Sequence, residues 1–117
     1  MSQLLELDAD SFEKEVLPAA VERGIGIQAM KVFGNAFLLR VMNAEECLDY
    51  ALSLPIHCAA IGCSTDGQLD DDVRFAQRFK PLSGAEMDNL RKVAVTAGPG
   101  GVKGPALEYW KRGLDGR

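Results

Sequence analysis

The sequence predicts an α/β fold, because short strand-like segments alternate with longer helix-like segments along the chain. Residues 25–33 and 57–62 are apolar runs bounded by glycine, proline and other turn residues. Neither run shows the polar alternation of a one-sided sheet, so both are expected to be strands covered on both faces. Residues 3–7 are a candidate third strand. Helices between such strands predict βαβ units with parallel pairing and right-handed connections.

The first predicted helix covers residues 11–23. Asp10 and Glu13 have the spacing of a capping box, and apolar residues then recur at helical intervals. Gly24 stands where a glycine commonly ends a helix. Pro18 lies inside the segment and lacks the N–H of a helical hydrogen bond, so it should kink the helix or mark its weakest point.

Three further helices are predicted, each from an N-terminal capping pair and an apolar face. The pairs are Asn43 with Glu46, for a helix that ends at Pro55; Thr65 with Gln68, for residues 66–79; and Ser83 with Glu86, for a helix to about residue 96. The expected apolar faces are Cys47, Leu48, Ala51 and Leu52 in the first; Leu69, Val73, Ala76 and Phe79 in the second; and Met87, Leu90 and Ala94 in the third.

The length and composition fit one globular domain without a basic surface. The chain has 117 residues, of which 47% are hydrophobic and 26% charged, a balance typical of folded domains. We expect residues 1–97 to form the domain and residues 98–117 to form a Gly/Pro-rich arm that carries Tyr109 and Trp110. The net charge is −4 and no run of lysine or arginine occurs. Nucleic acid and anionic membranes are therefore not expected partners.

The sequence indicates a cytoplasmic protein. The longest stretch without a formal charge, residues 50–65, contains Pro55 and is too short for a spanning helix of about 20 apolar residues. The N-terminus lacks the basic start and the apolar segment of a secretory signal. Cys47, Cys58 and Cys63 are odd in number and have no C-x-x-C spacing, so we expect reduced, buried thiols and no zinc site.

Most polar clusters in the sequence are explained better by structure than by chemistry. His57 is the only histidine, and in an extended chain it lies roughly 20 Å from Cys63, so the two cannot form a catalytic pair. We expect His57 to hydrogen-bond the backbone where a strand begins. The carboxylates of residues 45–46 and 70–72 fall in first or second helical turns and should form solvated faces. Residues 98–104, GPGGVKG, lack the spacing and context of a phosphate loop.

The carboxyl ends of the two predicted strands are the most informative positions for function. The turn of residues 62–67 runs from a strand into a helix N-terminus, where N–H groups and the helix dipole favour anions and where α/β sheets place ligands. A capped turn without a ligand is an equally good interpretation, and Asp66 opposes a strong phosphate site. Lys31, at the end of the other strand, is either a solvated terminus or part of a site. The second interpretation requires both strand ends to open onto the same site.

Two segments resemble the last third of the aldo-keto reductase family, specifically the branch whose penultimate barrel strand ends in a Met-Lys pair. The segments are VLPAAVERGIGIQAMKVFG and ECLDYALSLPIHCAAIGCSTDGQLDDDVRFAQRFKPLS, and the similarity runs from about residue 12 to residue 83. The resemblance implies a partial (β/α)8 TIM-barrel fragment with parallel strands, flanking helices and about three of the eight βα units. A complete barrel needs at least ~200 residues.

The resemblance also implies a chemistry. Members of the family transfer hydride from a nicotinamide cofactor, usually the phosphorylated form, to an aldehyde or ketone. Their tyrosine acid and its assisting lysine, aspartate and histidine come from earlier strands than those that match, so no catalytic residue is assigned. We therefore expect a truncated aldo-keto-reductase-like protein that is inactive alone, or else a non-enzymatic module that self-associates or binds a partner. Bare sheet edges favour a homodimer or a larger assembly.

The cofactor-side positions of the family fall on the two strand ends. Met30 occupies the place of the aromatic residue that stacks on nicotinamide in many members, and Lys31 follows it at the rim of the site. Gly62, Cys63 and Ser64 match the loop that holds the adenosine-side phosphate, where many members place lysine and serine first. The resemblance thus implies NADP or NAD as the cofactor of this surface.

Two further positions depart from the family in charge. Gln68 falls where an arginine often grips the phosphate, and Asp72 falls where an asparagine often meets adenine. Both make the surface less positive, so the preference for the phosphorylated cofactor is expected to weaken. The cofactor-binding residues that the resemblance implies are Met30, Lys31, Gly62, Cys63, Ser64, Gln68 and Asp72, and no metal site is expected.

Overall fold

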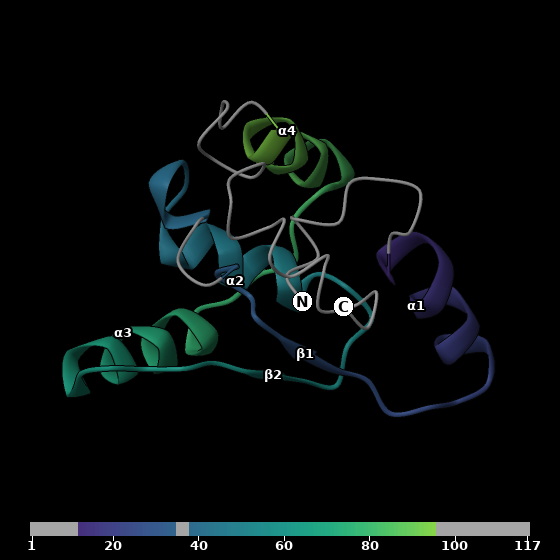
Figure 1. Cartoon of the computed structure of the whole chain (residues 1–117), viewed down its shortest axis with the longest axis horizontal. Helices are drawn as coiled ribbons and strands as arrows, with labels where there is room; N and C mark the ends of the chain where they lie inside the picture. The colour runs from purple at the N-terminus through teal and green to yellow at the C-terminus, as the bar shows by residue number, and fades with distance from the viewer. Residues whose placement is uncertain (1–11, 35–37, 96–117) are drawn as a thin grey trace, which may run out of the picture.

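The computed structural model describes residues 12–34 and 38–95 (Figure 1). The candidate strand at residues 3–7 and the arm of residues 98–117 lie outside the described residues. The described elements are α1 (Phe12–Glu22), β1 (Gln28–Met30), the 3-10 turn η2 (Leu38–Arg40), α2 (Ala44–Leu52), β2 (Cys58–Ala60), α3 (Asp66–Gln77) and α4 (Gly84–Val95).

The two strands confirm the α/β class and the parallel pairing. β1 pairs with β2 in parallel, with Gln28 opposite Cys58 and Met30 opposite Ala60. Each strand has three residues, so both are shorter than the predicted runs. β1 stops where Lys31 adopts a left-handed backbone, with φ of 57°. A residue in that conformation cannot continue an extended strand.

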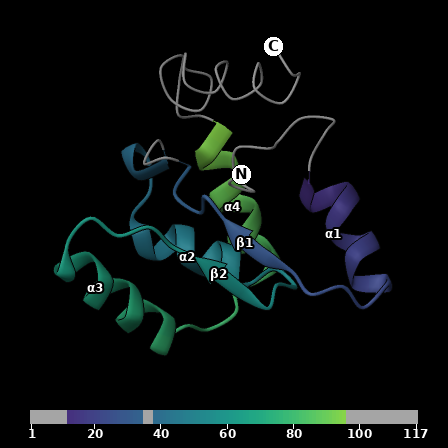
Figure 2. The same ribbon diagram turned by 60° about the horizontal axis from the view of Figure 1, so that its bottom comes forward.

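The prediction that both strands are covered on both faces is wrong. Helices α2 and α4 lie behind the strand pair in Figure 2, and the buried core lies on that side. Ala29 points into the core, whereas its neighbour Met30 is 53% exposed. β2 follows the same pattern, with Ala59 half-buried and Ala60 exposed. Layers of helices cover both faces only in a doubly wound sheet, and here the described helices pack on one face.

Helix α1 ends as its sequence predicts. Gly24 has φ of 65°, its N–H donates to the Val21 carbonyl at 3.1 Å, and the Ile25 N–H donates to the Ala20 carbonyl at 3.0 Å. This pair of bonds is a Schellman motif, in which glycine takes the left-handed position without a Cβ penalty. The helix continues through Pro18, which removes one donor without ending it. The Asp10 half of the predicted capping box lies outside the described residues.

The capping pairs of the later helices are confirmed. In the pair of Thr65 and Gln68, the Gln68 side chain accepts the Ser64 N–H instead of the Thr65 N–H. The reciprocal bonds of Asn43 and Glu46 measure 2.8 and 3.1 Å, and those of Ser83 and Glu86 measure 3.2 and 3.3 Å. Thr65 caps α3 as predicted. These caps satisfy N–H groups that the first helical turn leaves free.

The core is formed by the predicted faces of α2 and α4, except that Leu52 is only partly buried. Cys47, Leu48 and Ala51 are buried from α2, together with Tyr50, and Met87, Leu90 and Ala94 are buried from α4. Burial raises the pKa of the Cys47 thiol from 9.0 to about 12 and also raises the pKa of Tyr50.

We expect the protein to lose stability in alkaline solution. The contribution of Cys47 is complete below pH 9.0 and is lost toward pH 12, because above pH 9.0 the thiol ionises in the unfolded chain but stays protonated in the fold. The phenol of Tyr50 acts in the same direction. The urea midpoint should therefore be lower at about pH 10.5 than at about pH 8. The substitution Cys47→Ala should reduce this difference, and equal midpoints in the original chain would contradict the prediction.

Helix α3 does not bury its predicted apolar face. Leu69 and Val73 are about half exposed, and none of the described residues of α3 is buried. The helix instead lies beside α2. The guanidinium of Arg78, at the end of α3, binds both carboxylate oxygens of Glu45 in α2, at 2.6 and 2.7 Å. Because β2 is the last described strand on this side, no further strand supports the apolar face of α3 (Figure 1). Glu45, predicted to lie on a solvated face, forms this ion pair at the surface, with its side chain 33% exposed.

Candidate functional site

The carboxyl ends of β1 and β2 lie at the same end of the sheet. Because the strands are parallel and Met30 is opposite Ala60, the chain leaves both strands on one side. Met30 and Lys31 therefore share this end with the loop of residues 62–64, as a common site requires. Met30 and Lys31 are both exposed there. This arrangement satisfies the geometric condition for a ligand site at the strand ends.

A tight turn fixes the direction of the chain at Lys31. The Gly34 N–H donates to the Lys31 carbonyl at 2.8 Å, and Lys31 and Gly34 have φ of 57° and 58°. A lysine in the left-handed region costs on the order of 1 kcal/mol relative to its ordinary backbone conformations. Such outliers are worth examining for function, since the surrounding structure must hold them in place.

The loop after β2 satisfies its own hydrogen bonds. The Ser64 N–H donates to the Gln68 side-chain oxygen at 2.7 Å, and the Gln68 N–H donates to the Thr65 hydroxyl at 3.1 Å. A phosphate at this loop would have to displace Gln68 from the Ser64 amide. The loop is therefore closed by its own side chains as the capped-turn interpretation requires, and an anion would bind only in competition with them.

Cys63 and Asp72, two of the positions suggested by the resemblance, contact each other. The Cys63 Sγ donates to Asp72 Oδ2 at 3.3 Å, which raises the pKa of the Cys63 thiol. Both Cys63 and Cys58 are exposed, so the prediction of buried thiols holds only for Cys47. Cys58 lies on the uncovered face of the sheet and Cys63 lies in the loop after it.

The three cysteines should react with iodoacetamide at different rates. Cys47 should be alkylated only when the chain unfolds, because it is buried. Cys63 should react more slowly than Cys58 near neutral pH, because Asp72 disfavours its thiolate. The substitution Asp72→Asn should speed the alkylation of Cys63 and leave Cys58 unchanged, as followed by peptide mass spectrometry. Asp71→Asn serves as the control, and an equal effect of both variants on Cys63 would contradict the assignment.

The start of α3 is strongly acidic. Asp66, Asp70, Asp71 and Asp72 all lie within its first seven residues, and Asp71 forms an ion pair with Arg74. Negative charge suits a helix N-terminus but repels a phosphate. Among the described residues, no group of three or more histidine, cysteine or acidic side chains is arranged to hold a metal ion.

His57 has the structural role that its position predicts. Its imidazole Nδ1 accepts the Ile27 N–H at 2.9 Å, and its backbone N–H donates to the Ile27 carbonyl at 2.8 Å. These bonds join the two chain segments just before β1 and β2 begin. The histidine therefore supports the strand register and takes no part in the strand-end site.

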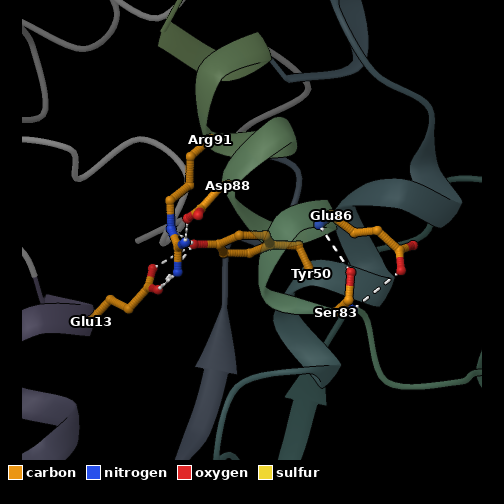
Figure 3. A network of polar contacts seen from close by, with 6 residues as sticks. All are labelled: Glu13, Tyr50, Ser83, Glu86, Asp88 and Arg91. Atoms are coloured by element: carbon orange, nitrogen blue, oxygen red, sulfur yellow. Dashed lines mark hydrogen bonds and ion pairs between the residues drawn. The ribbon is translucent and has the colours of Figure 1, made fainter.

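Sequence reasoning missed a polar network that joins α1, α2 and α4 (Figure 3). The Tyr50 hydroxyl lies 2.7 and 3.0 Å from the two carboxylate oxygens of Glu13, and it accepts the Arg91 Nε–H at 2.8 Å. Arg91 also pairs with Glu13 at 2.7 Å and with Asp88 at 2.6 Å. Tyr50 is 1% exposed, and a buried phenol needs a polar partner. That requirement was the available signal, because Tyr50 lies three residues after Cys47 and therefore on the same side of the predicted helix.

Fold and surface together define a small α/β module with a parallel strand pair, helices on one face and an exposed strand-end rim. None of the described helices is both long and apolar enough to cross a membrane. No protein-family model matches the chain, and no curated protein or solved structure matches it.

Proposed function

We propose that this chain is a non-catalytic, self-associating module built from barrel-type βα units, and that a second copy covers the open face of β1 and β2. One observation carries the proposal: the helices cover a single face of the strand pair, leaving Met30, Cys58 and Ala60 exposed on the other. In a (β/α)8 barrel the helices also cover only the outer face, while the barrel's other strands cover the inner face. The aldo-keto reductase resemblance supports such units.

The edges of the sheet support association as well. β1 and β2 pair with each other, so in the described sheet each has one edge whose N–H and C=O groups have no neighbouring strand. Exposed edges of this kind tend to pair with another chain. A second copy has the same edges and the same uncovered face, so a symmetric dimer can pair the edge N–H and C=O groups and cover the exposed face in both copies at once.

The test places a charge on the uncovered face. Ala60→Lys adds a solvated lysine to the monomer, but in an assembly that lysine would be buried without a partner. Ala85→Lys is the matched control, because Ala85 is an exposed alanine on α4. Size-exclusion chromatography with light scattering should show a dimer or larger assembly for the original chain and for Ala85→Lys, and a monomer for Ala60→Lys. A monomeric original chain at micromolar concentration, or identical behaviour of the two variants, would defeat the proposal.

We propose, as a second candidate, that the strand-end rim binds a reduced nicotinamide nucleotide without turnover. The supporting observation is that Met30 and Lys31 share one end of the sheet with residues 62–64. The acidic start of α3 and the occupied Ser64 amide favour the nucleotide without the extra phosphate. The aldo-keto reductase resemblance places the catalytic groups outside the matching segment, which is why no turnover is expected.

Nucleotide binding and turnover are measured separately. Reduced nicotinamide nucleotide is titrated by its fluorescence, and its absorbance is then followed with a panel of aldehydes. Lys31→Met should weaken binding severalfold, whereas Lys92→Met, at an exposed lysine of α4, should not. Absence of binding would reject this second function, and turnover would reject the non-catalytic assignment.

A further inference from the structure

One carboxylate joins helix α1 to α2 and α4. Glu13 is the polar anchor, since it binds both the Tyr50 hydroxyl and the Arg91 guanidinium (Figure 3). Among the α1 residues whose burial is described, Leu17 is buried, whereas Val16 and Val21 are exposed. Contacts between α1 and the other described elements are few. The polar part of the attachment is a small receptor on the core, formed by Tyr50 and Arg91.

The receptor groups converge on a carboxylate. The Tyr50 hydroxyl comes from a side chain that is 1% exposed, and Arg91 stacks on the Tyr50 ring at 5.4 Å. Asp88 binds another nitrogen of Arg91 at 2.6 Å, which holds the guanidinium in place. A hydroxyl and a guanidinium directed at one point recognise a carboxylate through charge-assisted hydrogen bonds. In this structure the carboxylate is Glu13 of the same chain.

The connection between α1 and the sheet is a single glycine hinge. The Schellman bonds hold Ile25 to the end of α1, and the bonds of Ile27 to His57 hold the start of β1. Gly26 lies between these two fixed points, and a Cβ placed on it would meet no atom within 4 Å. Rotation at Gly26 can therefore move α1 as a rigid unit without breaking either set of bonds.

We propose that α1 exchanges between two copies of the chain, so that Glu13 of each copy occupies the Tyr50–Arg91 receptor of the other. Exchange makes the same contacts in trans that the structure shows in cis, so it needs no new complementary surface. The inference rests on the proposed self-association and specifies how the two copies are joined. α1 precedes β1 directly, so exchange would bring the second copy to the strand pair.

Charge reversal on separate copies tests the exchange. Glu13→Arg places a cation against Arg91, and Arg91→Glu places an anion against Glu13. In each variant alone, positions 13 and 91 therefore repel each other, both within one copy and between copies. In an exchanged heterodimer of the two variants, both contacts between positions 13 and 91 join opposite charges. Mixing should therefore lower the apparent dissociation constant by about tenfold or more relative to either variant alone. Native mass spectrometry identifies the heterodimer, because the two substitutions change the mass in opposite directions.

The control is an ion pair that exchange cannot rearrange. Asp71 and Arg74 lie on the same exposed helix, and Asp71→Arg mixed with Arg74→Glu carries the same opposite change in net charge. This mixture should show no preference for the heterodimer. If it gains as much as the Glu13→Arg and Arg91→Glu mixture, general attraction between the chains is the cause and the exchange is rejected.

A deletion covers the case in which the charge-reversed variants fail to fold. Removing Gly26 shortens the hinge and strains the contact of α1 with its own receptor, and short, strained hinges favour exchange. On dilution to concentrations at which the original chain is partly monomeric, the deletion variant should stay dimeric if α1 exchanges, and a deletion variant that dissociates at the same concentration as the original chain, or at a higher one, would overturn the inference. An original chain that dimerises through Ala60 while the mixture shows no heterodimer preference would overturn the exchange and leave the proposed self-association intact.

Discussion

Replacing Tyr50 with alanine should lower the free energy of unfolding by about 3–5 kcal/mol. Tyr50 is 1% exposed, so its ring fills space in the core that the shorter side chain would leave empty. The substitution also removes the hydroxyl that joins Glu13 of α1 to Arg91 of α4. Small domains have a total stability of about 5–15 kcal/mol, so this variant should be largely unfolded in moderate urea.

Tyr50→Phe separates the ring from the hydroxyl. It keeps the packing and should cost about 1.5–3 kcal/mol, the usual range for a hydrogen bond to a charged group. Val21→Ala, at an exposed position of α1, should stay within about 0.5 kcal/mol. Urea unfolding followed by circular dichroism measures all three. If Tyr50→Phe cost as much as Tyr50→Ala, the hydroxyl network would carry most of the energy, and a cost-free Tyr50→Ala would mean that the ring is not packed.

Local signals in the sequence predict the helices well. The pairs Asn43–Glu46 and Ser83–Glu86 make the reciprocal bonds that their spacing indicates, and Gly24 ends α1 in the left-handed conformation that only glycine adopts cheaply. These features depend on residues three or four positions apart. Propensity and capping chemistry therefore decide them before the chain folds.

Burial of the strands could not be predicted in the same way. The run before Lys31 is apolar except for Gln28, yet Met30 is exposed and Ala29 is buried, because only one face of the sheet meets the described helices. An apolar run indicates two covered faces only when something covers them. The exposed apolar face of α3 has the same explanation, since α3 packs beside α2 and no described element covers Leu69.

The polar network was hidden for a different reason. Glu13 and Tyr50 are 37 residues apart, and Glu13 and Arg91 are 78 residues apart. No periodicity connects positions at such distances, and only the packing of α1, α2 and α4 brings them together. By contrast, the meeting of the two strand ends follows from parallel pairing alone, so the sequence could predict that residues near Lys31 and Ser64 share one end of the sheet.

The strand-end rim and the Tyr50–Arg91 receptor differ in what they offer a ligand. At the rim, the Ser64 amide is occupied by Gln68 and the nearby charges are mostly acidic. At the receptor, a cation and a hydroxyl converge on one carboxylate that belongs to a loosely attached helix. The receptor is therefore the more complete binding site of the two, and its ligand is part of the chain itself.

Leu38→Ala should cost about 2–5 kcal/mol, because this side chain is 0% exposed and its loss would leave a cavity in the core. The adjacent Leu39 is 43% exposed, so Leu39→Ala should stay within about 0.5 kcal/mol. The two substitutions remove the same atoms from the same short 3-10 turn, which makes them a matched pair. Urea unfolding followed by circular dichroism measures both.

The position of Leu38 also connects the core to the strand-end rim. Its N–H donates to the Phe33 carbonyl at 3.3 Å, and Phe33 belongs to the turn that holds Lys31 in its left-handed conformation. Leu38→Ala should therefore loosen that turn as well as the core, and amide hydrogen exchange at Gly34 should accelerate in this variant and not in Leu39→Ala. Equal free energies of unfolding for the two variants would show that the Leu38 side chain does not contribute to the packing of the core. Unchanged exchange at Gly34 would show that the turn holds Lys31 independently of Leu38.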